Sequence, residues 1–147
     1  MKDKQIRTIV LGIFRHEDRL LVFEGYDPIR DVTFYRPLGG GIEFGEYGRQ
    51  ALIREMREEL AADITGLRYM GAIENIFTHA GGQGHEIVLV YEARFVDPDF
   101  YRRSTFAGAE DDGVPITVSW KPLSDFRNGA FLVPIELRDF LDLGHAS

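Results

Sequence analysis

Residues 40–62 of this 147-residue chain read GGIEFGEYGRQALIREMREELAA, and they carry the strongest structural signal in the sequence. Leu52, Met56 and Leu60 recur at four-residue intervals. This is the spacing of a helix with one buried stripe, because positions four apart lie on the same helical face. The spacing predicts a helix over residues 47–61.

The acidic side chains of this segment gather beside the apolar stripe. At about 100° per residue, Glu55, Glu58 and Glu59 fall within about 100° of one another on the helix. Glu55 and Glu59 are like charges at positions i and i+4, which costs an isolated helix roughly a few tenths of a kcal/mol. A hard divalent cation would turn this repulsion into a binding site, since such ions prefer carboxylate and carbonyl oxygens. The alternative is a solvated acidic face, in which Arg54 pairs with Glu58.

The spacing of the charged residues is more specific than any single carboxylate. It runs Gly, five residues, Glu, seven residues, Arg-Glu, an apolar residue, any residue, Glu-Glu, and it is met by Gly40, Glu46, Arg54, Glu55, Glu58 and Glu59. This pattern resembles the Nudix box of the Nudix hydrolase family. The resemblance implies an α/β fold, an α/β/α sandwich with a mixed β-sheet, in which the box forms a loop, a helix and a second loop.

The resemblance also implies an activity and a metal. The activity is magnesium-dependent hydrolysis of a phosphoanhydride bond in a nucleoside diphosphate linked to another moiety, X, which releases a nucleoside monophosphate. The residues that would hold Mg²⁺, for which Mn²⁺ is the expected substitute, are Glu55, Glu58, Glu59 and, through its carbonyl, Gly39. Arg54 and Glu46 would orient these carboxylates, because displaced ligands lose the geometry that the metal requires.

The general base is left open by the same resemblance. Glu55 and Glu59 are candidates within the box. The first candidate outside the box is Glu110, on a polar loop late in the chain, and the second is Glu86, at the start of a predicted strand. For Glu110 and Glu86 alike, plain solvent exposure is the alternative.

Residues just before the box are suited to binding substrate. Gly39 and Gly40 would let the backbone approach a phosphate closely. Arg36 directly precedes this glycine-rich segment and is placed to bind a phosphate, and Tyr35 could stack on a base. The alternative roles, a surface ion pair for Arg36 and core packing for Tyr35, are equally consistent with the sequence.

The chain departs from the pattern of the family at the two ends of the helix. Ala61 stands where the family usually has glycine, so a left-handed residue ending the helix there would be strained. Tyr47 and Gly48 stand where many relatives have a Ser or Thr cap, which leaves Glu46 as the main local compensation for the positive helix end. Neither change removes a carboxylate.

Composition limits the class of protein. A length of 147 residues with 44% hydrophobic content supports one domain, over residues 1–147. Cysteine is absent, which excludes disulfides and thiolate metal sites. A net charge of -7 argues against extended nucleic acid and favours a small nucleotide-derivative substrate as the partner.

No apolar stretch approaches the roughly 18 residues that cross a bilayer, so we expect no membrane partner and a cytoplasmic protein. The resemblance leaves a homodimer open.

The remaining elements are predicted from their apolar patterns and turn residues. They are a hairpin of residues 6–14 and 19–23 with a turn at 16–18, a short strand over 33–36 leading into a tight glycine loop over 37–41, a second hairpin of residues 67–78 and 85–95, a long polar connection over 97–113, a strand over 114–120 and a terminal helix over 134–143.

Two other functions compete with hydrolysis. The main alternative is a noncatalytic Nudix-like regulatory module that binds a nucleotide metabolite without turning it over, but the intact carboxylates argue against it. Metal-dependent isomerisation of an isoprenyl diphosphate ranks third, because such enzymes need further catalytic residues and the chain has no cysteine to supply a common one.

Overall fold

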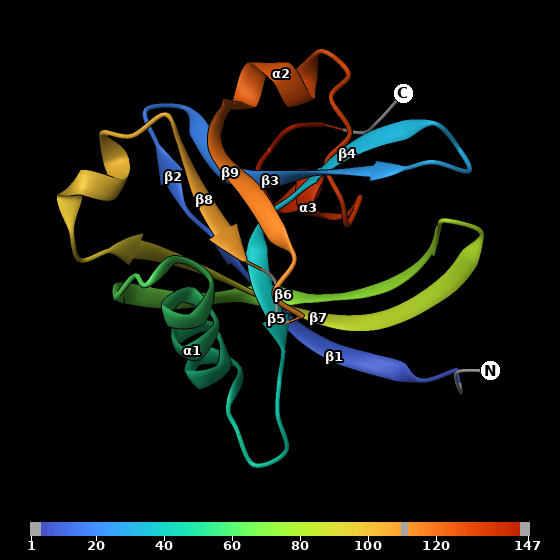
Figure 1. Cartoon of the computed structure of the whole chain (residues 1–147), viewed down its shortest axis with the longest axis horizontal. Coiled ribbons are helices and arrows are strands. Elements are labelled where there is room, and N and C mark those ends of the chain that lie inside the picture. The colour runs from blue at the N-terminus through green and yellow to red at the C-terminus, as the bar shows by residue number, and fades with distance from the viewer. Residues whose placement is uncertain (1–3, 110–111, 145–147) are drawn as a thin grey trace.

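Two β-sheets lie at the centre of the molecule, a computed structural model whose description covers residues 4–109 and 112–144 (Figure 1). The first sheet has the strand order β5 (Leu38–Gly41), β1 (Ile6–Ile13), β7 (Gly82–Phe95) and β6 (Ile64–His79). β1 runs parallel to β7, and the other pairs are antiparallel. The second sheet is antiparallel, with the order β2 (Arg15–His16), β3 (Arg19–Asp27), β9 (Pro115–Pro122) and β8 (Thr105–Ala109), and β4 (Val32–Arg36) also pairs with β3.

Helices lie on both sides of these sheets. They are α1 (Gly48–Leu60), the 3-10 helix η1 (Pro98–Tyr101), α2 (Leu123–Arg127) and α3 (Leu137–Phe140). In Figure 1, α1 lies below the crossing strands and α2 lies above them. This arrangement confirms the predicted α/β sandwich with a mixed sheet. No helix within residues 4–109 and 112–144 is long and apolar enough to cross a membrane.

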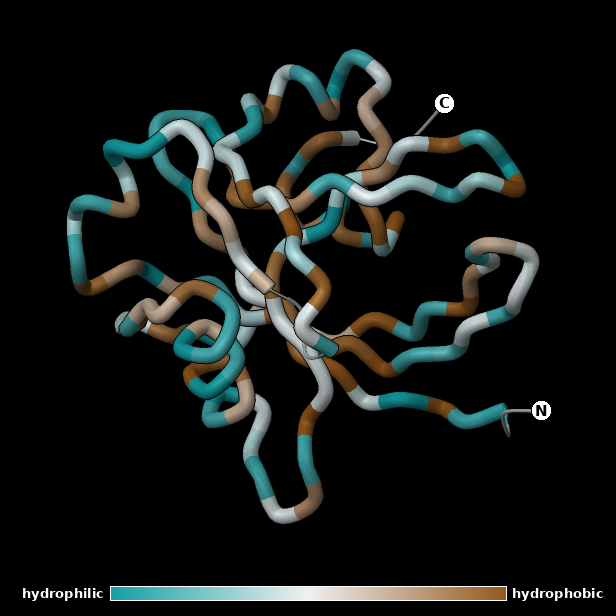
Figure 2. The backbone as a smooth tube through the Cα atoms, in the orientation of Figure 1, coloured by the Kyte–Doolittle hydropathy of each residue, from teal (hydrophilic) through white to brown (hydrophobic). Residues whose placement is uncertain are grey.

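Alternate residues of the central strands feed two hydrophobic cores. Val10 of β1 packs in the same core as Leu52 and Met56 of α1. Its neighbours Ile9 and Leu11 belong to the other core, with residues of α2 and α3. Successive side chains of a strand point to opposite faces, so β1 is covered on both sides and anchors α1 against the first sheet. Figure 2 shows the apolar residues concentrated on these central strands.

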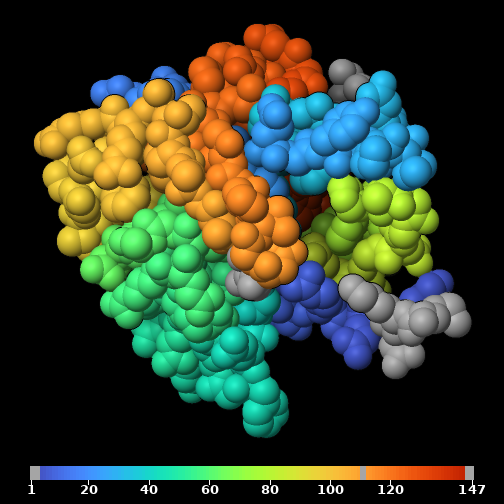
Figure 3. All heavy atoms as spheres, in the orientation of Figure 1, coloured from blue at the N-terminus to red at the C-terminus, as the bar shows by residue number. Residues whose placement is uncertain are grey.

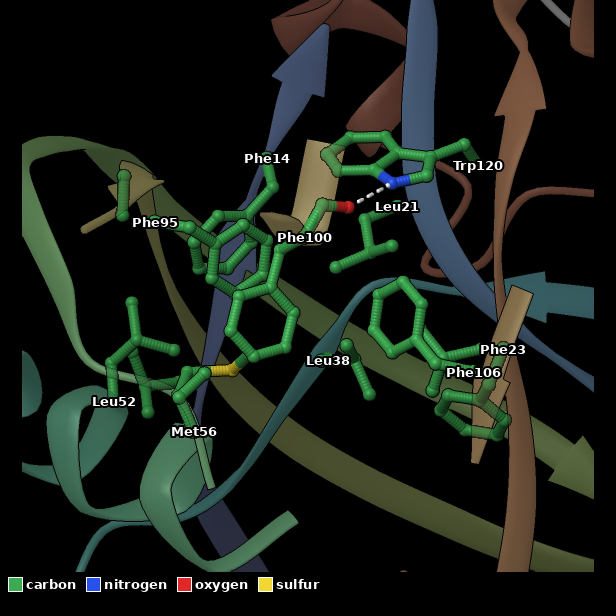
Figure 4. Close-up of a cluster of buried hydrophobic side chains, with 14 of the residues drawn as sticks. Phe14, Leu21, Phe23, Leu38, Leu52, Met56, Phe95, Phe100, Phe106 and Trp120 are labelled. Atoms are coloured by element: carbon green, nitrogen blue, oxygen red, sulfur yellow. Dashed lines mark hydrogen bonds between the residues drawn. The ribbon is translucent and has the colours of Figure 1, made fainter. Parts of the chain in front are cut away.

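The core beneath α1 is rich in aromatic rings (Figure 4). Phe95 stacks on both Phe14 and Phe100, with ring centroids 4.5 and 4.6 Å apart. Trp120 is also buried there, and its Nε1 donates a hydrogen bond to the Phe100 carbonyl over 2.9 Å. The expectation that Trp120 packs in the core is confirmed, and its one polar atom is satisfied.

The helix predicted over residues 47–61 is confirmed as α1, but its start is capped differently from the prediction. The Gln50 side chain accepts a hydrogen bond from the Tyr47 backbone N–H over 2.9 Å. Glu46 accepts instead from the Glu43 N–H and from Arg54. At the other end Ala61 adopts the left-handed conformation, with φ 53° and ψ 37°. Alanine thus takes the left-handed conformation that was expected to be strained at this position.

The first predicted hairpin is wrong. Residues 6–13 form β1 of the first sheet, whereas residues 19–27 form β3 of the second, and the chain crosses from one sheet to the other at Phe14. The predicted turn at residues 16–18 is confirmed, because β2 and β3 pair on either side of Glu17 and Asp18. The second predicted hairpin is confirmed as β6 and β7.

Three further segments differ from the prediction. The glycine loop is largely a strand, because residues 38–41 form β5 and pair with β1. The predicted connection over 97–113 contains η1 and β8, and β8 pairs with β9. The predicted helix over 134–143 is helical only at Leu137–Phe140, and the short helix α2 was not predicted.

Candidate active site

Arg54 on α1 is the centre of the hydrogen-bond network around the box. Its Nε and Nη2 atoms donate to the two carboxylate oxygens of Glu46 over 2.9 and 3.0 Å. Nη2 also donates to the Gly41 carbonyl at the end of β5, over 2.9 Å. The planar guanidinium matches a carboxylate with two parallel bonds. Arg54 therefore ties the loop before α1 and the end of β5 to the helix.

The remaining nitrogen of Arg54 faces the metal-binding candidates. Nη1 donates to Glu55 Oε1 over 3.0 Å and to Glu58 Oε2 over 3.3 Å. The same nitrogen lies 3.9 Å from Glu43 Oε1. One arginine atom thus holds two of the three predicted ligands on the same side of α1.

The electrostatics of this network keep its members charged. The hydrogen bonds from Arg54 are the largest cause that holds the pKa of the Glu46 carboxyl below its usual range. Glu46 in turn is the first cause that raises the pKa of the Arg54 guanidinium, with Glu55 contributing as well. An opposite charge in hydrogen-bond contact favours the ionised form of both groups. Arg54 and Glu46 are therefore a permanent ion pair at neutral pH.

The glycine at position 40 is required by the position of Glu55. The Glu55 side chain is 1% exposed, and a Cβ built on Gly40 would lie 2.4 Å from its carboxyl carbon. The adjacent Gly39 has φ +157°, and a Cβ there would lie 1.9 Å from the Val10 carbonyl oxygen. The successive glycines therefore let β5 approach both β1 and the Glu55 carboxylate.

The donor chemistry at this site fits a hard divalent cation. Glu59 is 8% exposed, and half of the Glu58 side chain, 53%, is open to solvent. All three predicted ligands offer carboxylate oxygens, the atoms that Mg²⁺ prefers. As the side chains stand, however, no three His, Asp or Glu residues within the described parts of the chain are close enough together to hold an ion.

A cleft of about 520 Å³ opens beside these carboxylates. Its lining includes Arg54, Glu55 and Glu58 of α1, and Arg7 and Thr8 of β1. Sequence reasoning missed Arg7. The available signal was weak, because Arg7 is one polar residue near the start of an apolar strand and only the pairing of β1 with β5 brings it beside the box.

A second cavity, also of about 520 Å³, separates the β3–β4 hairpin from the β6–β7 hairpin. We call it the aromatic cavity, since its walls include Phe23, Phe34, Phe77 and Phe131. Figure 3 shows the surface hollowed between these two hairpins. Arg36 and Glu86 both line the aromatic cavity.

The other predicted site residues lie elsewhere. The Tyr35 ring lines neither of these two cavities and packs against Phe126 and under the Lys121 ammonium, 4.3 Å from its centroid. Tyr35 therefore packs against its neighbours, which was the alternative to stacking on a base. Glu110 lies outside the described residues.

Comparison with known proteins gives the class and the family. The family model of the NUDIX domain matches residues 3–136. A NUDIX hydrolase from Nitrosomonas europaea shares the fold with 16% sequence identity and a TM-score of 0.63, over 95% of this chain and 88% of that one. A NUDIX-family hydrolase from Clostridium perfringens is 18% identical with a TM-score of 0.59, over 95% of this chain and 96% of that one. A MutT NUDIX hydrolase from Burkholderia pseudomallei is 19% identical with a TM-score of 0.53, over 82% of this chain and 86% of that one. No curated protein matches the chain.

Fold, site and family model together define a pyrophosphohydrolase. The chain belongs to the Nudix family. Enzymes of this family use a divalent metal ion and act on small nucleotide derivatives.

Proposed function

We propose that the chain hydrolyses a phosphoanhydride bond in a nucleoside diphosphate linked to a moiety X, with Mg²⁺ as the metal. The observation that carries the proposal is the contact of Arg54 with both Glu55 and Glu58, beside a cleft. Support for a nucleotide substrate comes from the similarity in fold to a protein described as an ADP compounds hydrolase.

The metal site in this proposal consists of Glu55, Glu58 and Glu59, with the Gly39 carbonyl as a further ligand. Bound Mg²⁺ would neutralise phosphate charge and lower the pKa of a water molecule. Arg54 and Glu46 act as positioning residues, because their ion pair fixes the guanidinium that Glu55 and Glu58 contact. Rotation of Glu58, the exposed member, is the simplest way to bring the carboxylates together.

Charge in the cleft suits an anionic substrate despite the net charge of -7. Arg7 lines the same cleft as Glu55 and Glu58 and has no salt bridge within the described residues. A cation placed beside metal-bound carboxylates favours the phosphates electrostatically. We therefore assign substrate phosphate to Arg7. Arg36, the residue predicted from the sequence for this role, lines the aromatic cavity instead.

The positions of the candidate carboxylates reduce the choice of general base. Glu55 is buried and already bonded to Arg54, so it is poorly placed to take a proton from water. Glu86 lines the aromatic cavity rather than the cleft. Glu110 is the first candidate for the base in this proposal, and Glu59, which is also buried, ranks after it.

The experiment is product release from a panel of substrates, each assayed with Mg²⁺ and with a chelator. The panel contains ADP-ribose, sugar nucleotides, dinucleoside polyphosphates, nucleoside triphosphates and dimethylallyl diphosphate. Release of a nucleoside monophosphate that stops with chelator is the expected result, and the second product identifies X. Saturable binding without turnover across the panel would reject hydrolysis and leave a regulatory module as the function.

A further inference from the structure

Three charged side chains line the aromatic cavity: Arg30, which is exposed and donates to the Thr78 carbonyl, and Arg36 and Glu86, which do not neutralise each other. Glu86 is 6% exposed, and Arg36 has a buried Nε. The two residues line the same cavity but form no salt bridge within the described chain. A buried charge without a partner is unfavourable, so a ligand that meets both charges would be bound selectively.

Glu86 keeps most of its capacity to accept hydrogen bonds. Its one hydrogen bond within the described residues comes from Asn75 Nδ2 over 3.3 Å, to Oε1. An ionised carboxylate has about four acceptor positions. Other donors line the cavity, among them Thr78, His79 and Gln83, but within the described residues only Asn75 donates to Glu86.

Arg36 is the complementary group in this cavity. Its guanidinium lies over the Phe23 ring, 5.1 Å from the centroid. Arg36 Nε has no hydrogen-bond acceptor among the described residues. The cavity thus presents an acceptor and a donor among several aromatic side chains, which fits a flat heterocycle whose edge carries both kinds of group.

The pairing of strands connects this cavity with the cleft at the box. Asn75 of β6 is opposite Glu86 of β7, and Glu86 is opposite Arg7 of β1. Paired positions share one face of a sheet, with strands about 5 Å apart. Glu86 therefore stands one strand away from Arg7, which lines the cleft. A substrate with its phosphates in the cleft can place its heterocycle in the aromatic cavity.

We propose that Glu86 is the residue that determines which nucleobase the enzyme accepts. In this inference, which rests on the proposed function, the Glu86 carboxylate accepts hydrogen bonds from the N–H edge of the base, and Arg36 donates to a neighbouring carbonyl or ring nitrogen. Bases with two adjacent N–H groups gain most from a carboxylate, because both can donate to it. The predicted order of affinity has guanine first, adenine and cytosine next, and uracil last.

The test is calorimetric binding of GMP, AMP, CMP and UMP in the presence of chelator, so that it does not depend on turnover. Glu86→Gln replaces one hydrogen-bond acceptor by a donor. It should lower the affinity for GMP about 10- to 100-fold, the usual effect of losing a charged hydrogen bond, and should lower the affinity for UMP much less. The matched control is Glu74→Gln, which removes the same charge from an exposed position of β6 outside the cavity. It should leave all four affinities unchanged.

Ligand variants test the same contact in the unaltered protein. 1-Methyl-GMP lacks the N1–H and IMP lacks the 2-amino group, so each should bind at least about 10-fold more weakly than GMP. An equal loss for every base in Glu86→Gln, equal affinity of GMP and 1-methyl-GMP, or no binding of any monophosphate would overturn the inference. Base-selective binding without hydrolysis would instead reject the proposed function alone.

Discussion

At the scale of single residues, the Glu55 carboxylate occupies the space that a side chain at position 40 would fill. A Cβ at position 40 would lie within 2.4–2.6 Å of all three carboxyl atoms of Glu55. Such a distance is far inside van der Waals contact, so the carboxylate must move. The role of this glycine is therefore to leave space for a predicted metal ligand.

Gly40→Ala should accordingly impair metal binding more than folding. We expect Mg²⁺-dependent turnover to fall about 10- to 100-fold, the usual cost of displacing a metal ligand from its geometry. Titration of turnover with Mg²⁺ measures the effect. The control is Gly41→Ala, where the nearest atom to the new Cβ is Arg7 Nη2 at an ordinary 3.6 Å. Equal losses in the two variants would contradict the space-filling argument.

Ala61 provides a second prediction at this scale. Its φ of 53° is in the left-handed region that favours glycine. Ala61→Gly should raise the free energy of unfolding by roughly 0.5–1 kcal/mol, since relief of strain outweighs the greater freedom of glycine in the unfolded chain. Urea unfolding measures it. A loss of stability would show that the left-handed alanine is not strained.

At the scale of elements, Arg54 joins α1 to β5 and to the loop between them. Its partners are Glu46 in the loop, the Gly41 carbonyl in β5, and Glu55 and Glu58 in the helix. The guanidinium therefore fixes the loop and the end of β5 relative to a helix that core packing already anchors.

Arg54→Lys should break this connection, because an ammonium cannot make the paired bonds of a guanidinium. We expect a loss of about 2 kcal/mol in unfolding free energy and a fall in turnover of about 10- to 100-fold. Arg57→Lys is the matched control on the same helix, since Arg57 is 64% exposed and pairs only with Asp63 among the described residues. Comparable losses in both variants would mean that Arg54 contributes charge alone.

At the scale of the whole molecule, Asp27 joins the tips of the two sheets. It is 3% exposed and accepts hydrogen bonds from the backbone N–H groups of Ile29 and Arg30 in the β3–β4 turn. Burial alone would raise the pKa of the Asp27 carboxyl, but backbone N–H groups of Arg30, Ala80 and Ile29, with the nearby His79, hold it below the ordinary 3.8. Since Ala80 lies in the β6–β7 turn, the carboxylate links the hairpins that border the aromatic cavity.

The lowered pKa gives this link a defined pH dependence. Asp27 stabilises the fold fully above its ordinary pKa of 3.8, and the contribution is lost as the pH falls through the lower pKa of the folded protein. The stability advantage of the wild type over Asp27→Asn should therefore be largest near neutral pH and shrink toward pH 3. Urea unfolding of both proteins across this range measures the difference. An advantage that grows on acidification would contradict the link.

Features set by local sequence were predictable, and features set by packing between distant segments were not. The four-residue period of Leu52 and Met56 identified α1, because helical contacts are local. The sequence did not show that residues 6–13 and 19–27 belong to different sheets. Much of both strands is buried on both faces, so apolar and polar residues do not alternate along them.

The same distinction applies to the site. The box gave the residues around Arg54 directly, but the meeting of Arg36 and Glu86 in one cavity depends on the register of several strands. Strand β8 was missed because Gly108 packs against Leu60 and the Glu59 carbonyl, where a Cβ would lie 3.1 and 3.2 Å away. Small residues fit that space but give little strand signal.

The most direct test of the proposed metal site is Mg²⁺-dependent turnover by Glu58→Gln and Glu59→Gln, with circular dichroism to verify the fold and Glu74→Gln as the control for charge. We predict a loss of about 100-fold or more in each site variant, because a metal ion contributes several kcal/mol to stabilising the transition state. Helix content should be retained in both. Unchanged turnover in both site variants would contradict the assigned metal site.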